Sequence, residues 1–169
     1  MVTRSLLVST ALSACVANAA LAEECKQERA VYADRDGAYE LAFEPVGSEA
    51  AAITHRFKVK AVKGELVLDG HIMMGDEVVR SIGMVMHNCP EGDVTGEEIA
   101  ACTVWQGIVY PLDQATGMPA ELVPAEGEDA AQRLLFAGIG PALRFSNAWD
   151  EGKLSIAPWD VLTYKGCAQ

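Results

Sequence analysis

The segment from His55 to His87 constrains the fold most, because it contains three apolar stretches separated by two short breaks. The breaks, Lys63-Gly64 and Gly75-Asp76-Glu77, are typical of the turns that join antiparallel strands. A two-residue turn at the first break pairs Phe57 with Gly70 and places the apolar residues of both strands on one face. We therefore predict an antiparallel meander of three strands.

The second turn decides which face of the third strand is buried, since a shift of one residue reverses every side chain. A three-residue loop at 75–77 pairs Met74 with Val78 and Leu68 with Met84, and it again collects the apolar residues on one face. In this register the sheet separates two sets of side chains. The core-facing set includes Met74, Met84 and Met86, and the opposite set includes His71, Met73 and His87.

Turn and capping signals divide the rest of the chain into short elements. Strands are predicted at 37–44 and 102–110, and a hairpin at 143–164. Helices are predicted to start at Thr95 and Asp129, because Glu or Gln follows each of them three residues later. The predicted fold class is mainly β (β-rich α+β), an antiparallel meander that closes into a small sandwich or barrel with one or two short helices.

The first 22 residues have the pattern of a secretory signal peptide. Arg4 is followed by small and apolar residues that end in Ala20-Leu21-Ala22. We therefore predict a periplasmic or secreted protein in which residues 23–169 form a single domain with no transmembrane span, since a span needs about 20 apolar residues. A second interpretation stays open, because Leu12-Ser13-Ala14-Cys15 resembles a lipobox in which Cys15 would carry a lipid anchor.

Cleavage after Ala22 leaves four cysteines, and an even number in an oxidising compartment predicts disulfides. Three pairings of four cysteines are possible. We favour a short loop closed by Cys89 and Cys102, and a bond between Cys25 and Cys167 that joins the two ends of the domain.

The charge of the chain argues against nucleic acid as a partner. The sequence has 24 Asp and Glu against 13 Lys and Arg, a formal net charge of −11 at pH 7. Such a surface repels phosphate backbones, and no cluster of Lys and Arg stands out against it.

The stretch 71–87 contains two histidines and four methionines, which are residue types that bind copper. In the predicted register His71 and Met73 are neighbours on one face, and His87 lies on the same face but roughly 20 Å further along the sheet. The other three methionines lie on the opposite face. The methionines that face the core are then explained by packing. We therefore expect no metal and no cofactor, and we keep a periplasmic copper-binding protein built on His71 and the methionines as the first alternative.

Known catalytic signatures do not occur in the sequence. His87 and Cys89 alternate onto one face of a strand, but a disulfide would consume the Cys89 thiol. We predict a non-enzymatic binding protein of the cell envelope, with an envelope protein or a small ligand as its partner; an enzyme with an unrecognised carboxylate site stays a further alternative. The expected recognition region is the long loop 111–128 together with the tail around Trp149 and Trp159.

Overall fold

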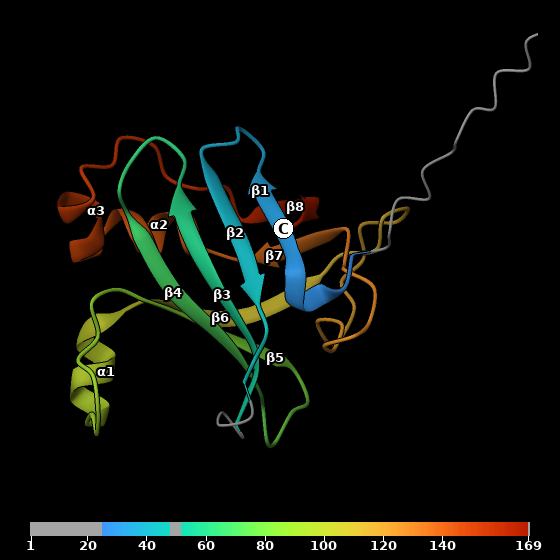
Figure 1. Cartoon of the computed structure of the whole chain (residues 1–169), viewed down its shortest axis with the longest axis horizontal. Helices are drawn as coiled ribbons and strands as arrows, with labels where there is room; N and C mark the ends of the chain where they lie inside the picture. The colour runs from blue at the N-terminus through green and yellow to red at the C-terminus, as the bar shows by residue number, and fades with distance from the viewer. Residues whose placement is uncertain (1–24, 48–51, 169) are drawn as a thin grey trace, which may run out of the picture.

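The computed structural model describes residues 25–47 and 52–168, and these residues form one closed barrel of eight antiparallel strands (Figure 1). Each strand pairs with the next along the chain, and the last strand pairs with the first. The predicted signal peptide 1–22, with Cys15 inside it, lies outside the described residues.

The described strands and helices alternate with short connections. The strands are β1 (Ala30–Asp34), β2 (Tyr39–Glu44), β3 (Ile53–Ala61), β4 (Val67–Met74), β5 (Ser81–Met86), β6 (Thr103–Pro111), β7 (Arg133–Phe136) and β8 (Val161–Cys167). The helices are the 3-10 turn η1 (Gln27–Arg29) and the α-helices α1 (Gly96–Cys102), α2 (Ile139–Arg144) and α3 (Asn147–Glu151). The predicted mainly β fold class is confirmed, with a barrel as its closed form and three α-helices instead of one or two.

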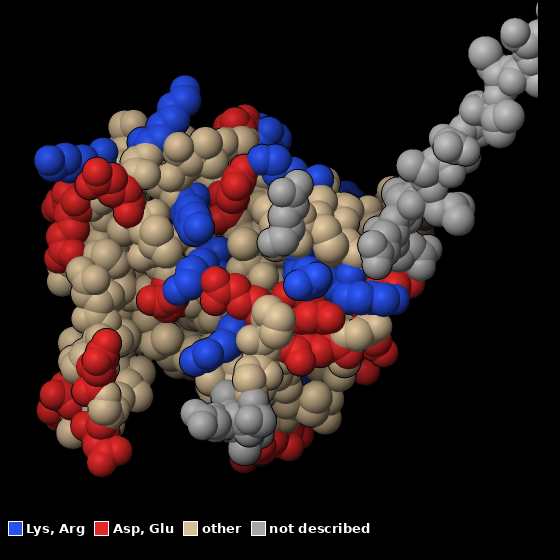
Figure 2. Space-filling model, in the orientation of Figure 1, with Lys and Arg blue, Asp and Glu red and all other residues tan. Residues whose placement is uncertain are grey.

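The first hairpin has the predicted register. Phe57 lies opposite Gly70 and Lys58 opposite Asp69, and Lys58 Nζ lies 2.6 Å from Asp69 Oδ1. Figure 2 shows basic and acidic side chains interleaved on the side of the barrel that β2, β3 and β4 form. The capping box at Thr95 is also confirmed, since the side chains of Thr95 and Glu98 each accept a hydrogen bond from the other residue's backbone N–H.

The predicted register of the second hairpin is wrong. Met74 pairs with Ser81 and His71 with Met84, so the connection is the six-residue segment 75–80 instead of a three-residue loop. The observed register is shifted by three residues from the predicted one. Because this shift is odd, every side chain of β5 lies on the face opposite to the predicted one. Ser81, Gly83 and Val85 face the barrel interior, whereas Met84 and Met86 lie on the outer face together with His71.

Packing against β6 explains this reversal. A Cβ on Gly83 would lie 2.6 Å from Val109 Cγ2 and 3.0 Å from the Trp105 ring, so bulky groups from the neighbouring strand already occupy the space beside β5. The interior therefore accepts glycine at this position, and the larger apolar residues of β5 point outward.

Aromatic rings fill the barrel interior. Tyr32 contacts Phe43, Phe43 contacts Phe57 and Phe57 contacts Phe136, with ring centroids 5.7 Å apart in each pair. Phe136 in turn contacts Trp105 at 5.3 Å. An eight-stranded barrel has an interior just wide enough for side chains, so this packing leaves the outer surface and the barrel ends for binding.

The region from residue 129 to residue 160 differs from its prediction. The helix predicted to start at Asp129 does not form, because Arg133–Phe136 is strand β7, which lies between β6 and β8 and closes the wall with Leu134 and Phe136 fully buried. Helices α2 and α3 replace the first strand of the predicted tail hairpin. No helix in the described part of the chain is long and apolar enough to cross a membrane.

Two disulfides cross-link the domain, Cys25–Cys167 and Cys89–Cys102, and these are the two pairs that the spacing favours. The first joins the residues just before β1 to the end of β8. The second fastens the end of α1 to the segment that follows β5. Stable disulfides are consistent with an oxidising extracytoplasmic location, because the cytosol keeps thiols reduced.

Candidate recognition groove

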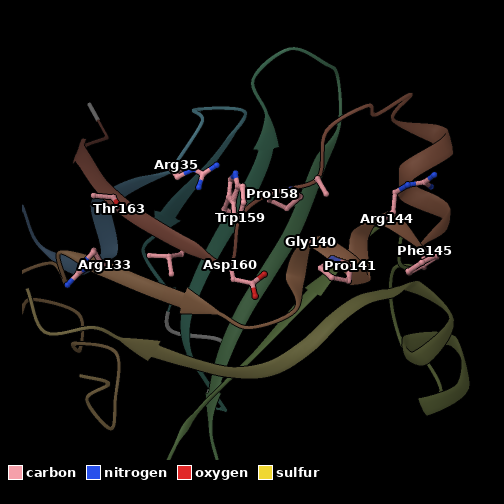
Figure 3. A pocket seen from close by; sticks show the side chains of 12 residues that line it. Arg35, Arg133, Gly140, Pro141, Arg144, Phe145, Pro158, Trp159, Asp160 and Thr163 are labelled. Carbon is pink, nitrogen blue, oxygen red and sulfur yellow. The ribbon is translucent and has the colours of Figure 1, made fainter. Parts of the chain in front are cut away.

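An open groove lies on the outside of the barrel between α2 and the segment that leads into β8 (Figure 3). It has a volume of about 880 Å³. Its lining combines apolar side chains with three guanidinium groups. The charged and aromatic residues of the lining are Arg35, Arg133, Arg144, Phe145, Trp159 and Asp160. We call this feature the Arg–Trp groove.

Trp159 is held in the groove by the turn between β1 and β2. Its indole Nε1 donates a hydrogen bond to Asp36 Oδ2 at 2.7 Å, and the Arg35 guanidinium stacks on its ring with Cζ 3.8 Å from the centroid. Its backbone N–H points at Asp34 Oδ2 at 3.5 Å. The hydrogen bond from Trp159 lowers the pKa of the Asp36 carboxyl, which favours its charged form. The indole is therefore fixed in position while 45% of Trp159 stays exposed.

Helix α2 forms the opposite side of the groove. Its N-cap is Gly138, whose φ of 78° suits glycine and whose N–H donates to Asp160 Oδ2 at 2.9 Å. Gly140 allows close packing, since a Cβ there would lie 2.4 Å from the Pro158 carbonyl oxygen. These contacts place Arg144 and Phe145 at one end of the groove and leave Phe145 89% exposed (Figure 3).

The groove carries the opposite charge to the chain as a whole. Arg35, Arg133 and Arg144 line it together with the Asp160 carboxylate, and the Asp36 carboxylate that holds Trp159 also pairs with Arg35 at 3.4 Å. The guanidinium groups still outnumber these carboxylates, in a protein of net charge −11. Arg133 also donates to the carbonyl oxygens of Asp113 and Gln114, at 2.7 and 3.3 Å, which ties the long loop to this site. An anionic group in the groove would therefore meet a locally positive surface.

The two tryptophans of the predicted recognition region, Trp149 and Trp159, differ in exposure and in place. Trp159 lines the groove, whereas Trp149 in α3 is only 9% exposed. The Arg144 guanidinium covers the Trp149 ring, with Arg144 Cζ 4.6 Å from the ring centroid. The sequence patterns did not identify Arg35, Arg144 and Phe145 as residues of the recognition site. The turn 34–36 alternates acidic and basic residues, but its partner Trp159 lies more than a hundred residues further along the chain, so no local pattern connects the two.

The other nominated residues lie elsewhere in the fold. His71 and Met73 are on the outer face of β4, and His87 Nε2 lies 2.8 Å from Glu151 Oε2. All four cysteines of the described part of the chain are in disulfides. Within residues 25–47 and 52–168, no three His, Cys, Asp or Glu side chains converge in a way that would hold a metal ion.

Comparison with known proteins finds no relative that would assign a function. No protein-family model matches the chain, and no curated protein or solved structure is significantly similar to it. The function is therefore inferred from the residues of the barrel itself.

Proposed function

We propose that this protein is a non-enzymatic binding protein of the cell envelope, and that the Arg–Trp groove recognises an acidic, partly apolar segment of a partner protein. The observation that carries the proposal is the association of three guanidinium groups with two exposed aromatic rings in an otherwise acidic molecule. Arg and aromatic residues contribute most of the energy at many protein interfaces.

The exposure of Phe145 favours a protein over a small ligand as the partner. Its ring projects from the end of α2 instead of covering the floor of the groove (Figure 3). A projecting ring gains free energy when a partner surface covers it, by roughly 25 cal/mol per Å² of buried apolar area. Trp159 is clamped before binding, so little side-chain entropy is lost when a partner packs on it.

The charge of the groove selects the chemistry of the partner. Carboxylates of an acidic segment pair well with guanidinium groups, which offer several N–H donors in one plane. A basic segment would be repelled by the groove. Electrostatic attraction to the groove is also expected to weaken as salt concentration rises.

Fluorescence anisotropy with labelled peptides tests this proposal. The probe is a set of about 12-residue peptides in which Asp and Glu alternate with Leu and Phe, together with copies in which Asn and Gln replace the acids; the length matches a standard interface of about 800 Å² per partner. We expect the acidic peptides alone to bind. Arg144→Glu and Phe145→Ala should each weaken binding at least about tenfold, the effect of losing 1.4 kcal/mol.

Two matched variants control for general effects of charge and exposed apolar area. Arg80→Glu and Val78→Ala change the same residue classes in the loop between β4 and β5, where both residues lie outside the groove. Equal binding of acidic and neutral peptides, or equal loss in the control variants, would refute the proposed recognition.

Export by the predicted signal peptide is part of the proposal, and the two disulfides support it. N-terminal sequencing of the protein from its native host should give Glu23 as the first residue. A lipid-modified Cys15 at the N-terminus would instead establish the anchored alternative.

A further inference from the structure

The outer face of β4 and β5 brings one imidazole and three thioethers together. His71 lies directly opposite Met84. Met73 follows His71 by two residues on the same face, and Met86 follows Met84 in the same way. Directly opposed residues of an antiparallel pair have Cβ atoms about 5 Å apart, and diagonal neighbours are about 7–8 Å apart. Long, flexible methionine side chains can bridge such distances.

Core packing does not explain these methionines. The inner face of the two strands consists of residues such as Leu68, Ile72 and Val85, which are almost completely buried. Met73, Met84 and Met86 are half-buried on the outer face, and they are three of the six methionines of the chain. Figure 2 shows uncharged surface between the charged side chains over β2–β4 and the acidic side chains of α1.

The neighbouring groups favour a soft monovalent ion. Arg56 lies opposite His71 on the β3 side, and the Asp69 carboxylate beside His71 is paired with Lys58. The carboxylate nearest to His71 in the register is thus already paired, and the next one, Glu44, lies opposite Arg56 on the far side of the guanidinium. Burial, and secondly Arg56, lowers the pKa of His71, which favours the neutral imidazole whose nitrogen lone pair can bind a metal.

We propose that His71, Met73, Met84 and Met86 form a Cu(I) site on the outer wall of the barrel. Thioether sulfur is a soft ligand that selects Cu(I), and imidazole also binds copper. The four donors come from two adjacent strands, with His71 and Met84 directly opposed and with Met73 and Met86 as their diagonal neighbours on either side. The site is independent of the Arg–Trp groove, because the strand order places β4 and β5 across the barrel from β8.

Anaerobic titration with Cu(I) against a chromogenic Cu(I) chelator tests the site. The full chain is used with Cys15→Ser, with both disulfides intact and without a histidine tag, so that neither a free thiol nor added imidazoles bind the ion. We expect one Cu(I) per chain. His71→Ala and Met84→Leu should each lower the affinity more than about tenfold, which is the least that loss of a supporting residue costs at metal sites.

Matched variants distinguish the site from adventitious binding. Met118→Leu removes an exposed thioether from the long loop, and His87→Ala removes an imidazole that lies away from the outer β4–β5 pair. Both should bind Cu(I) like the unchanged protein, and circular dichroism should show that every variant is folded. Failure to compete with the chelator, or an equal loss in the two control variants, would overturn the proposal.

Discussion

At the scale of single residues, Gly70 leaves the least room for a Cβ among the glycines in the described part of the chain. That Cβ would lie 2.1 Å from Cε2 and 2.3 Å from Cζ of Phe57, far closer than van der Waals contact allows. Phe57 is fully buried and contacts both Phe43 and Phe136, so its ring cannot move without disturbing its neighbours. Glycine is therefore required on β4 opposite Phe57.

We predict that Gly70→Ala lowers the free energy of unfolding by about 1–3 kcal/mol, the usual effect of overpacking a core. Urea denaturation followed by tryptophan fluorescence measures this change. Gly96→Ala is the matched control, since nothing lies within 4 Å of a Cβ at that position in the first turn of α1. Alanine also favours a helix, so the control should be neutral or slightly stabilising, and equal losses in the two variants would contradict the steric explanation.

Histidine burial predicts a loss of stability in weak acid. Burial lowers the pKa of His55, although its Nε2 lies 2.7 Å from the Pro124 carbonyl oxygen, and it also lowers the pKa of His71. In the unfolded chain both imidazoles titrate near a pKa of about 6.5. Below that pH the unfolded chain binds more protons than the native protein. The stabilising contribution is therefore complete above this pKa and is lost as the pH falls toward the folded-state value.

His55→Gln should make this pH dependence weaker, because glutamine does not titrate. The free energy of unfolding is measured at fixed pH values between about 7.5 and 5.5, where one histidine contributes at most about 1.4 kcal/mol per pH unit. We expect a smaller slope for His55→Gln and the smallest for the double variant with His71→Gln. Identical slopes in the unchanged and double-variant proteins would contradict this origin.

At the scale of elements, sequence patterns identify a strand best when its two faces differ in polarity. The β3–β4 hairpin and α1 were predictable because a two-residue turn and a capping box fix the register and the start of the helix locally. In β5 both faces carry apolar side chains, so polarity does not choose between them. The choice depends on Trp105 and Val109 of the next strand, which occupy the space beside Gly83.

Dependence on distant residues also explains why β7 was predicted as a helix and why the residues around Trp159 in the Arg–Trp groove were not predicted. Leu134 and Leu135 fit a helix or a strand, and only the need to bridge β6 and β8 selects the strand. Trp159 was identified from its residue type, but its clamp depends on the distant turn 34–36. Contacts between residues that are far apart in the chain leave little trace in local patterns.

The long loop after β6 is fastened to the end of the barrel by a buried hydrogen bond. Ser81 Oγ, at the start of β5, accepts from the Val123 backbone N–H at 3.0 Å, and both residues are buried. We predict that Ser81→Ala costs about 1–3 kcal/mol, because the Val123 N–H loses its acceptor. Hydrogen exchange should accelerate at Val123 and its neighbours. Ser155→Ala, on an exposed segment, is the control and should change neither measurement.

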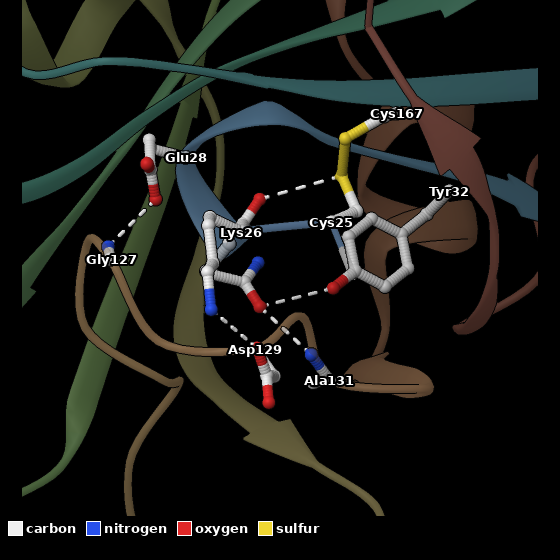
Figure 4. Close-up of a disulfide and its surroundings, with 9 residues drawn as sticks. Cys25, Lys26, Glu28, Tyr32, Gly127, Asp129, Ala131 and Cys167 are labelled. Carbon is white, nitrogen blue, oxygen red and sulfur yellow. Dashed lines mark hydrogen bonds and ion pairs between the residues drawn. A yellow bond between two sulfur atoms is a disulfide. The ribbon is translucent and has the colours of Figure 1, made fainter. Parts of the chain in front are cut away.

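At the scale of the whole molecule, closure of the barrel depends on one pairing between strands that are not neighbours in the chain. Seven of the eight strand pairs join neighbours in the chain, whereas β1 and β8 come from opposite ends. The Cys25–Cys167 disulfide lies at this seam, beside the pairing of Ala30 with Cys167 (Figure 4). Close to the seam, Gln27 ties β1 to the segment before β7, since its Oε1 accepts from the Tyr32 hydroxyl and from the Ala131 backbone N–H (Figure 4).

Removing the seam disulfide should therefore destabilise the protein more than removing the other one. Its sequence separation is 142 residues, against 13 for Cys89–Cys102. The chain-entropy model gives losses of about 5 and about 3 kcal/mol for the two double alanine variants. Opening the seam also exposes the edges of β1 and β8, which can pair with other chains. Urea denaturation measures the stabilities, and light scattering near the midpoint should show aggregation only for Cys25→Ala/Cys167→Ala. Equal stability of the two variants would mean that the β1–β8 hydrogen bonds hold the seam without the disulfide.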